Sequence, residues 1–441
     1  MNEIKSRTDE FLKKYGIYAG NIDIGAGCET FINEMEQGLK GEDSSLGMLC
    51  TYLSPEGEIP VNEPVIVMDA GGTNFRVAVV TFDNDKKPVI EDFKLYPMPG
   101  TQGEISREEF FDTIAQYLLP VINKSSRIGF CFSYPTEILP NKDGKLIRFN
   151  KEVKVRDMKG EEIGKRLLEA LKAKGADADK KFVILNDTVA TLLGGKAAYP
   201  DRKFESFIGF ILGTGTNTCY IEENANIHKA ASLKDKPGAT IINIESGGYA
   251  KAPRGEIDNI LDSKTVDPGT QLLEKMISGA YQGSLVTEVI RKAISEGLFS
   301  KDFEERFNKV EKLNSKDIDE FCAYPYSDKY VLSSCVNHGG SNSEKDRLTL
   351  YYLIDGVFER AARLVAINLA SIILKTGKGK NPLMPVCVTA EGTTFYKSKL
   401  FRPKLDYYVR TYLNDTLGIY CEFVKAENAT LIGTAIAGLL N

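Results

Sequence analysis

The stretch VIVMDAGGTNFRVAVVTF, residues 65–82, decides the fold. An apolar run, 65–68, ends at Asp69, and a second apolar run begins at Val77. Between them Gly71 and Gly72 permit the tight turn that joins two antiparallel strands. The same glycines let main-chain N–H groups come close to a phosphate. The stretch therefore predicts a β-hairpin whose turn is either an ordinary connection or a phosphate-binding loop.

The side chains around this turn have the chemistry of a phosphate-binding loop, although the turn taken alone is more often an ordinary connection. Thr73 and Asn74 add hydroxyl and amide donors, and Arg76 adds a charged donor. Asp69, at the end of the first strand, is placed to hold Mg²⁺ through a water molecule. The predicted phosphate contacts are Asp69, Gly71, Gly72, Thr73, Asn74 and Arg76.

A second turn of the same kind follows later in the chain. The apolar run 207–212 leads into Gly213-Thr214-Gly215-Thr216-Asn217, and a further strand covers 219–222. Two strand–turn–strand units indicate two related α/β halves that face each other across a cleft, where ligands of α/β proteins bind. Neither turn is a Walker loop, and Gly25-Ala26-Gly27, half of a dinucleotide fingerprint, is interpreted as a turn.

A third feature is the sequence VILNDTVATLL, residues 183–193. A strand over 182–185 meets a helix predicted to start near Val189, with Asn186, Asp187 and Thr188 between them. These residues are typical helix caps, and spacing alone favours that interpretation. The alternative is a carboxylate that acts as general base, which phosphoryl transfer to a hydroxyl requires. Ser133, Asn150, Lys151, Glu245 and Glu274 complete the polar residues with the chemistry to bind a sugar.

The remaining pattern predicts alternating strands and helices. Strands are expected at 89–96, 128–132, 241–244, 386–389 and 419–424. Helices are expected over most of the first 40 residues and at 107–119, 161–174, 269–297, 346–375 and from 429 onward.

The bulk properties exclude several classes of protein. The 441 residues carry 56 basic and 61 acidic side chains, a net charge of −5, which argues against a nucleic-acid binder. The eight cysteines form no CxxC pair and indicate a reducing compartment. The N-terminus lacks the apolar core of a signal peptide, and no apolar run approaches the roughly 18 residues of a membrane helix. We expect a cytoplasmic protein that does not bind a membrane. With only two histidines, acid–base chemistry falls to carboxylates.

In order along the chain, these motifs resemble those of the hexokinase family, of the eukaryotic type that some bacteria also carry. The resembling segments are SSLGMLCTYL, MDAGGTNFRVAVV, FSYPTEILPNKDGKLIRFNKEVKV, VILNDTVATLL, IGFILGTGTNTCYIEE, INIESGGYA, PGTQLLEKMISGAYQGSLV and VTAEGTTFYKSKLF. The resemblance implies an α/β, two-lobed actin-like ATPase (ribonuclease H-like) fold with a cleft between a small and a large domain. The small domain is expected at 65–186 plus 427–441, and the large domain at 1–64 plus 187–426.

The resemblance also implies roles for individual residues. Asp187 is expected to be the base, with Lys151 as the second catalytic residue. The sugar-binding residues are expected to be Ser133, Asn150, Lys151, Asn186, Asp187, Asn217, Glu245, Gln271 and Glu274. The nucleotide is expected at the first loop, at Gly213 and Thr214 of the second, and at Gly392 and Thr393 beside the adenosine.

Some positions depart from the family pattern. Asn150 replaces a threonine, Ser246 and Gly248 replace bulkier residues, Thr394-Phe395 stands where one residue is usual, and Glu427-Asn428 replaces a glycine-rich turn.

The expected activity is transfer of the γ-phosphoryl group of MgATP to a hexose by a monomer or homodimer. Glucose, giving glucose 6-phosphate at the first step of glycolysis, is the leading substrate. The alternatives are a kinase of another hexose (fructose or mannose), a glucose sensor without catalysis, and an actin-like filament former.

Overall fold

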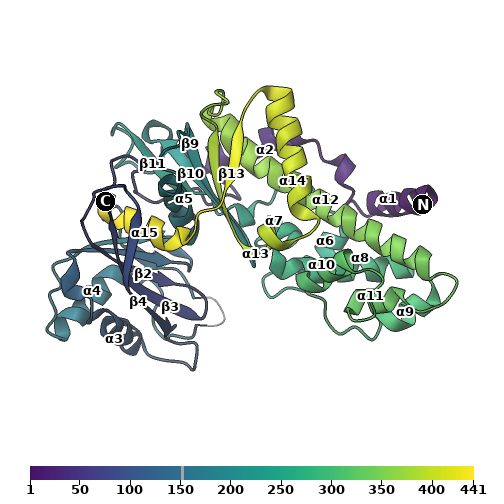
Figure 1. Ribbon diagram of the computed structural model, residues 1–441, viewed down its shortest axis with the longest axis horizontal. Coiled ribbons are helices and arrows are strands. Elements are labelled where there is room, and N and C mark those ends of the chain that lie inside the picture. The colour runs from purple at the N-terminus through teal and green to yellow at the C-terminus, as the bar shows by residue number, and fades with distance from the viewer. Residues whose placement is uncertain (150–152) are drawn as a thin grey trace.

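A computed structural model describes residues 1–149 and 153–441. The chain forms two main β-sheets (Figure 1). The smaller sheet has the strand order β4-β3-β2-β5-β8. Strands β2, β3 and β4 are an antiparallel meander, and β5 and β8 extend the sheet in parallel with β2. Their bounds are β2 Val65–Ala70, β3 Asn74–Phe82, β4 Pro88–Pro97, β5 Arg127–Phe132 and β8 Lys181–Leu185.

The larger sheet has the order β1-β11-β10-β9-β12-β13. Strands β9, β10 and β11 are antiparallel, and β12 and β13 continue in parallel with β9. Apart from β1, this is the strand order and direction of the smaller sheet, which confirms the predicted relation between the two halves. The bounds are β1 Leu49–Cys50, β9 Ser206–Leu212, β10 Thr216–Glu223, β11 Ala239–Asn243, β12 Val386–Glu391 and β13 Cys421–Val424.

Two helices lie between the sheets and join them. Helix α5 (Asp187–Ala198) follows the last strand of the smaller sheet but packs against β9 and β12 of the larger one. Helix α15 (Ala429–Leu440) follows the last strand of the larger sheet but packs against β2 and β5 of the smaller one. The two helices also pack extensively against each other. Each half therefore supplies the helix that covers the inner face of the other.

The central strands β2 and β5 of the smaller sheet are buried on both faces, as their continuous apolar sequences predict. Val65 and Val67 pack in a core with α5 and α15, whereas Ile66 and Met68 pack in a second core with α3 and α4. The strand period of two thus separates the two cores. The flanking elements are α3 (Arg107–Leu118), α4 (Ile163–Ala173) and the small hairpin β6 (Thr136–Ile138) and β7 (Gly144–Leu146).

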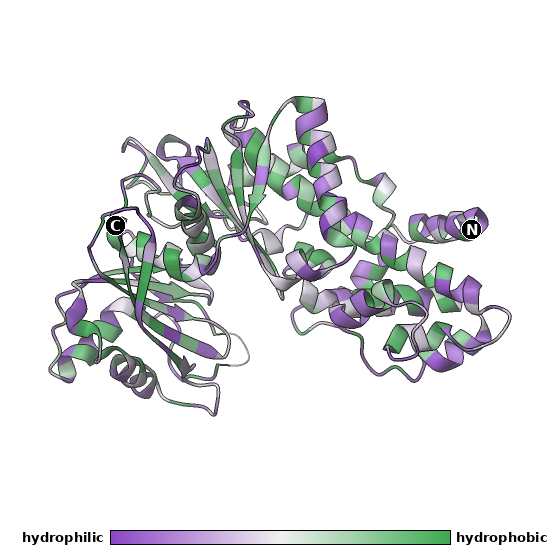
Figure 2. Cartoon of the chain, in the orientation of Figure 1, coloured by the Kyte–Doolittle hydropathy of each residue, from purple (hydrophilic) through white to green (hydrophobic). Residues whose placement is uncertain are grey.

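Helices cover the outer side of the larger sheet and extend away from it (Figure 1). The central one is α12 (Ser343–Thr376), a 34-residue helix that packs against α1, α2 and α14. Its fully buried Arg360 forms a two-bond ion pair with Asp258 of α6, at 2.6 and 2.7 Å. In Figure 2 the strands of both sheets are mainly hydrophobic, whereas the outlying α1 is largely hydrophilic. The helix bounds are α1 Asn2–Lys14, α2 Ile24–Lys40, α6 Glu256–Ser263, α7 Leu272–Ile277, α8 Gly279–Ser295, α9 Lys301–Phe307, α10 Ser315–Ala323, α11 Val331–Val336, α13 Thr393–Lys397 and α14 Phe401–Val409.

Two local predictions are corrected by the structure. Gly25-Ala26-Gly27 is not a turn but the first turn of α2, because the Asp23 side chain caps the helix by accepting from the Ala26 N–H at 2.8 Å. The helix predicted over 269–297 is two helices, α7 and α8, separated by Ser278 in an extended conformation. Within the described part of the chain, no helix is both long and apolar enough to cross a membrane.

Candidate active site

Asp69 and Asp187 come from two strands of the smaller sheet that end at the same edge. In the parallel register, Asp69 of β2 lies beside Cys131 of β5, which lies beside Leu185 of β8. Asp187 follows Leu185 by two residues, and Ser133 follows Cys131 by two. The carboxyl ends of parallel strands lie at the same edge of a sheet. This register therefore brings Asp69, Ser133 and Asp187 to one edge, as in other α/β sites.

Asp187 occupies the first turn of α5, with Asn186 as its cap. The Asn186 side chain accepts a hydrogen bond from the Thr188 N–H at 2.9 Å. One oxygen of Asp187, Oδ1, accepts from the same N–H at 2.8 Å and from the Thr188 hydroxyl at 3.3 Å. Its other oxygen, Oδ2, accepts from no residue that the structure describes. The capping role and the free carboxylate oxygen thus belong to adjacent residues, so the two interpretations of this segment are compatible.

The environment of Asp187 makes its carboxylate more basic than usual. Burial is the main cause and raises its pKa to about 6, and the nearby carboxylates of Asp69 and Glu245 act in the same direction. The hydrogen bonds from Thr188 oppose this rise. A carboxylate with a pKa near 6 is ionised at neutral pH yet accepts a proton more readily than an exposed aspartate.

Asp69 is paired with the arginine predicted to contact phosphate. Asp69 Oδ2 lies 2.5 Å from Nη1 of Arg76, its cross-strand neighbour in the β2–β3 hairpin. Burial raises the pKa of Asp69, and Arg76 lowers it. The arginine side chain is 42% exposed, so it remains accessible to a phosphate on the open side of the pair.

The first glycine turn is exposed, and a hydrogen bond from a buried tyrosine holds it. The Gly71 N–H donates to the Asn74 carbonyl at 3.1 Å, which closes the turn, while Gly72, Thr73 and Asn74 are exposed. The buried Tyr134 donates its hydroxyl to the Gly71 carbonyl at 2.9 Å. In the sequence FSYP, Ser133 thus lies at the edge of the sheet, and Tyr134 holds the loop through its hydrogen bond to Gly71.

The larger sheet supplies a network of amides around Glu245. The Asn243 amide donates to Glu245 Oε1 at 2.6 Å, and its oxygen accepts from Asn217 at 2.8 Å. Asn217 also donates to the same Glu245 oxygen, at 3.3 Å. Burial raises the pKa of Glu245, and the two amides oppose that rise. Glu245 Oε2 has no hydrogen bond with any described residue and is available to a ligand.

Gln271 and Glu274 lie against the same turns. Glu274 Oε2 accepts from the Thr216 N–H at 2.8 Å, and a Cβ at Gly215 would lie 2.6 Å from that oxygen. A Cβ at Gly247, two residues after Glu245, would lie 2.7 Å from the Gln271 side-chain oxygen. The glycines thus allow both side chains to approach the second loop and the Glu245 turn. Burial and the charge of Glu245 raise the pKa of Glu274.

The second glycine turn is joined to the segment predicted to contact adenosine. Gly213 accepts from the Gly279 N–H at 2.8 Å and from the Thr394 hydroxyl at 2.9 Å. Gly392 has a φ of +113°, and a Cβ there would lie 2.2 Å from the Leu212 carbonyl. Only glycine therefore fits at 392, and this close approach holds Gly392 and Thr393 beside the loop of Gly213 and Thr214.

A cavity of 540 Å³ opens next to this junction. It lies among α8, α10 and α13, and both apolar and polar side chains line it. Its lining residues include Gln282, Asp319, Phe358, Thr393, Thr394 and Lys399.

The structure therefore gathers the predicted residues in two groups. Asp69, Ser133, Asn186 and Asp187 belong to the smaller sheet, and Asn217, Glu245, Gln271 and Glu274 to the larger. The charges of Asp69 and Glu245 act on Asp187 from both sides, so the groups adjoin. Asn150 and Lys151 lie outside the described residues.

The sequence interpretation missed Asn243, which orients Glu245. In INIESGG, Asn243 precedes Glu245 by two residues, the spacing at which two side chains of an extended chain share one face. That spacing was the sequence signal from which the contact between Asn243 and Glu245 could have been predicted.

Known proteins resemble the whole chain. Two family models, both described as hexokinase, match residues 11–197 and 207–440. Hexokinase-1 of Spinacia oleracea is 30% identical, with 91% of this chain and 84% of that protein covered. Hexokinase-5 of Oryza sativa subsp. japonica is 31% identical, with 92% and 84% covered. A solved hexokinase structure from Schistosoma mansoni, complexed with glucose, is 24% identical, covers 99% of both chains and has a TM-score of 0.75.

The repeated sheets, each followed by a helix that covers the other, define the class of proteins with the actin-like ATPase fold. The family models and the curated relatives identify one family within this class. The chain belongs to the hexokinase family, whose enzymes phosphorylate sugars with a nucleotide as phosphoryl donor.

Proposed function

We propose that this enzyme transfers the γ-phosphoryl group of MgATP to the 6-hydroxyl of glucose, with Asp187 as the general base. The observation that carries the proposal is the Asp187 carboxylate, whose pKa is raised to about 6 and whose Oδ2 is free among the described residues. A base within hydrogen-bond reach of the sugar hydroxyl takes its proton as the phosphoryl group arrives.

The sugar would bind between the two groups of residues. Glu245, Glu274 and Asn217 offer acceptors and donors for neighbouring hydroxyls on the side of the larger sheet. Ser133 and Asn186 offer them on the side of the smaller sheet. Glu245 and Glu274 are half-buried and have raised pKa values, which is consistent with carboxylates that gain hydrogen-bond partners from the substrate.

The nucleotide would extend along the two loops. The exposed turn of Gly71–Asn74 and the turn of Gly213 and Thr214 offer main-chain N–H groups to the phosphates. Arg76 adds a positive charge, and Asp69 reaches the substrate magnesium ion through water. The cavity beside Gly392 and Thr393 would accept the adenosine. Catalysis would rest on positioning and charge neutralisation, because the transfer itself needs little covalent chemistry from the protein.

A coupled assay that measures ADP release with glucose, mannose, fructose and glucosamine tests the substrate. We expect the highest kcat/KM with glucose. A higher value with fructose or mannose would instead make the enzyme a kinase of that hexose. Sugar binding without ADP release would indicate a sensor, and ATP-dependent sedimentation would indicate a filament former.

The variant Asp187→Ala tests the assigned base. Loss of a general base lowers turnover by about 10²–10⁴-fold, whereas glucose should still bind in a calorimetric titration. Asp201→Ala, at an exposed aspartate, is the matched control and should keep full turnover. Normal turnover by Asp187→Ala would show that another group is the base.

A further inference from the structure

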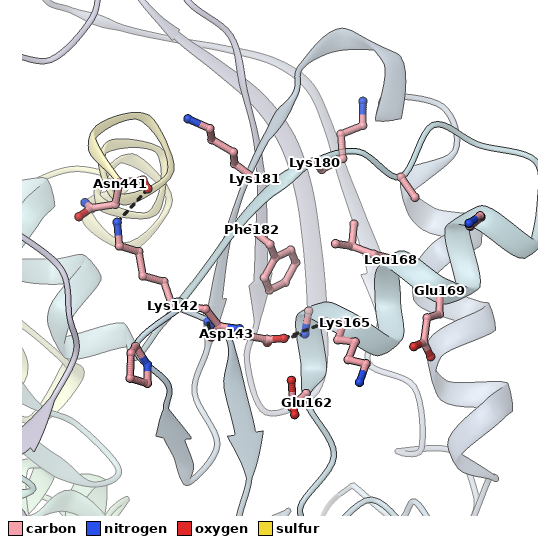
Figure 3. Close-up of a pocket in the computed structure, with 15 residues that line it drawn as sticks. Lys142, Asp143, Glu162, Lys165, Leu168, Glu169, Lys180, Lys181, Phe182 and Asn441 are labelled. Atoms are coloured by element: carbon pink, nitrogen blue, oxygen red, sulfur yellow. Dashed lines mark hydrogen bonds between the residues drawn. The ribbon is translucent and has the colours of Figure 1, made fainter. Parts of the chain in front are cut away.

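A cavity of 790 Å³ lies on the smaller sheet, and among the described residues none that is assigned above to sugar or nucleotide lines it (Figure 3). The turn between β6 and β7, the first turns of α4 and the segment that leads into β8 form its walls. Phe182, Leu168 and Pro140 give it an apolar part. It has the size of a small-molecule site.

Lysines are the main charged groups of this cavity. Five of them line it: Lys142, Lys165, Lys172, Lys180 and Lys181. They come from three separate segments, and Figure 3 shows Lys142 and Lys181 extending on the same side, near Asn441. The lining also holds three carboxylates, those of Asp143, Glu162 and Glu169.

Two of these carboxylates are already engaged. The buried Asp143 accepts from the Gly144 N–H at 2.7 Å, from the Gly164 N–H at 2.6 Å and from the Lys165 N–H at 2.9 Å. It thereby satisfies the main-chain donors at the start of α4. Glu169 pairs with Arg166 at 3.1 Å. Among the described residues, the Glu162 carboxylate neither accepts from main-chain N–H groups nor forms an ion pair.

The lysines, in contrast, are mostly without an acidic partner. Lys180 pairs with Asp177 at 3.2 Å, and Lys142 donates to the main-chain oxygen of Asn441 at 2.9 Å. Lys165, Lys172 and Lys181 form no ion pair with any residue of the described ranges. Burial and then the positive charges of Lys181 and Lys236 lower the pKa of Lys142. The ammonium groups thus repel one another, and a bound anion would relieve this repulsion.

We propose that this cavity is a binding site for a small metabolite that carries phosphate groups. Lysine ammonium groups bind phosphate as point charges, and several of them around one cavity favour a ligand with at least two negative charges. The apolar wall with Phe182 would contact the carbon skeleton between the charges. The volume of 790 Å³ fits a small molecule, and the net charge of −5 disfavours nucleic acid.

Calorimetric titration with fructose 1,6-bisphosphate as the probe tests this site. The full-length protein is first saturated with glucose and a non-hydrolysable ATP analogue, so that the sugar and nucleotide sites are occupied. We expect the dissociation constant to rise about tenfold or more in Lys142→Gln/Lys181→Gln, since two attractive charges are lost. The matched control Lys309→Gln/Lys312→Gln changes two exposed lysines that form no ion pair within the described residues, and it should bind as the wild type does.

Three results would overturn the proposal. They are equal affinity in the cavity variant and the wild type, loss of probe binding when the ATP analogue is present, and binding of citrate as tight as that of the bisphosphate. If the first double variant does not fold, Lys165→Gln/Lys172→Gln, at exposed side chains, replaces it with the same expectation. The experiment requires no turnover, so its outcome is independent of the proposed reaction.

Discussion

At the scale of the residue, Asp187 combines a hydrogen-bonded oxygen with one that accepts from no described residue. Thr188 fixes Oδ1, so the carboxylate keeps one orientation while Oδ2 is available to a hydroxyl proton. The raised pKa sets the pH range in which this oxygen acts as a base. The base must be ionised, so its activity is lost as the pH falls through the folded-state pKa.

We therefore expect kcat with saturating glucose and MgATP to be constant above about pH 7 and to fall about tenfold per pH unit below pH 6. Initial rates between pH 4.5 and 8 would measure this profile. An exposed aspartate as the base would instead keep full activity to below pH 5, and that result would contradict the raised pKa.

The same shift predicts that the carboxylate of Asp187 destabilises the fold. Its pKa is about 6 in the folded chain against 3.8 ordinarily, so the folded state binds more protons between these values. The contribution of this group to stability thus falls as the pH rises from about 4 to 6 and stays low at pH 7. Asp187→Asn should stabilise the protein at pH 7.5 by up to about 3 kcal/mol.

The measurement is the thermal midpoint of Asp187→Asn and wild type at pH 7.5 and 5. We expect a gain at pH 7.5 that is smaller at pH 5, together with lost turnover. Asp201→Asn, at an exposed site, should leave the midpoint unchanged. A destabilised Asp187→Asn protein at pH 7.5 would show that the carboxylate is better accommodated than its burial implies.

Asn243 provides a residue-scale prediction for sugar binding. Asn243→Ala removes the 2.6 Å bond that orients Glu245 and the 2.8 Å bond to Asn217. A hydrogen bond to a charged group contributes about 1.5–3 kcal/mol, so KM for glucose should rise about 10- to 100-fold. Because binding of the ground state is affected, kcat should change less. Steady-state kinetics measure both, with the exposed Asn308→Ala as control, and a fall in kcat at constant KM would contradict this role.

At the scale of the element, the contact between α5 and α15 determines how the two halves are joined. A Cβ at Gly433 of α15 would lie 1.8 Å from the Ala190 carbonyl of α5, and one at Gly194 would lie 2.3 Å from the Ala429 carbonyl. Glycines on both helices therefore let the two backbones touch. Because α5 begins at Asp187, a shift of this contact also shifts the proposed base.

Gly433→Ala should lower stability by at least about 1–3 kcal/mol, the cost of overpacking, and should reduce turnover as well. The thermal midpoint and kcat are the measurements. The control is Gly25→Ala, a helical glycine whose added Cβ would meet nothing closer than 3.3 Å. It should be neutral or slightly stabilising, since alanine favours helix. An unchanged midpoint in Gly433→Ala would mean that the helices separate at no cost.

The accuracy of the sequence interpretation follows the range of the interactions involved. Strands such as β2 and β5 were predicted because both faces are buried, which makes them continuously apolar. Gly27 was misassigned to a turn because the contact that requires glycine there involves a residue far away in the sequence. An added Cβ would lie 2.5 Å from Ile367 of α12. Asn243 was missed for the same reason, since its partner Asn217 comes from the neighbouring strand β10. The contacts of single motifs were predictable, but those between segments were not.

At the scale of the whole molecule, the proposed sugar site is divided between two sheets. Ser133 and Asp187 lie at the edge of the smaller one, and Glu245 and Glu274 belong to the larger one. Burial raises the pKa values of Asp187 and Glu274, and repulsion from the nearby carboxylate of Glu245 raises both further. A sugar that donates hydroxyl protons to both sides would offset this repulsion and draw the halves together, excluding water from the phosphoryl group.

Small-angle X-ray scattering should therefore show a smaller radius of gyration with saturating glucose than without it. Asp187→Asn should still contract, because the sugar contacts on the larger sheet remain. Glu274→Gln, which keeps an oxygen for the Thr216 N–H but loses the charge, should need a higher glucose concentration for the same contraction. Contraction with ATP alone, or none with glucose while calorimetry detects binding, would mean that the sugar does not bridge the two sheets.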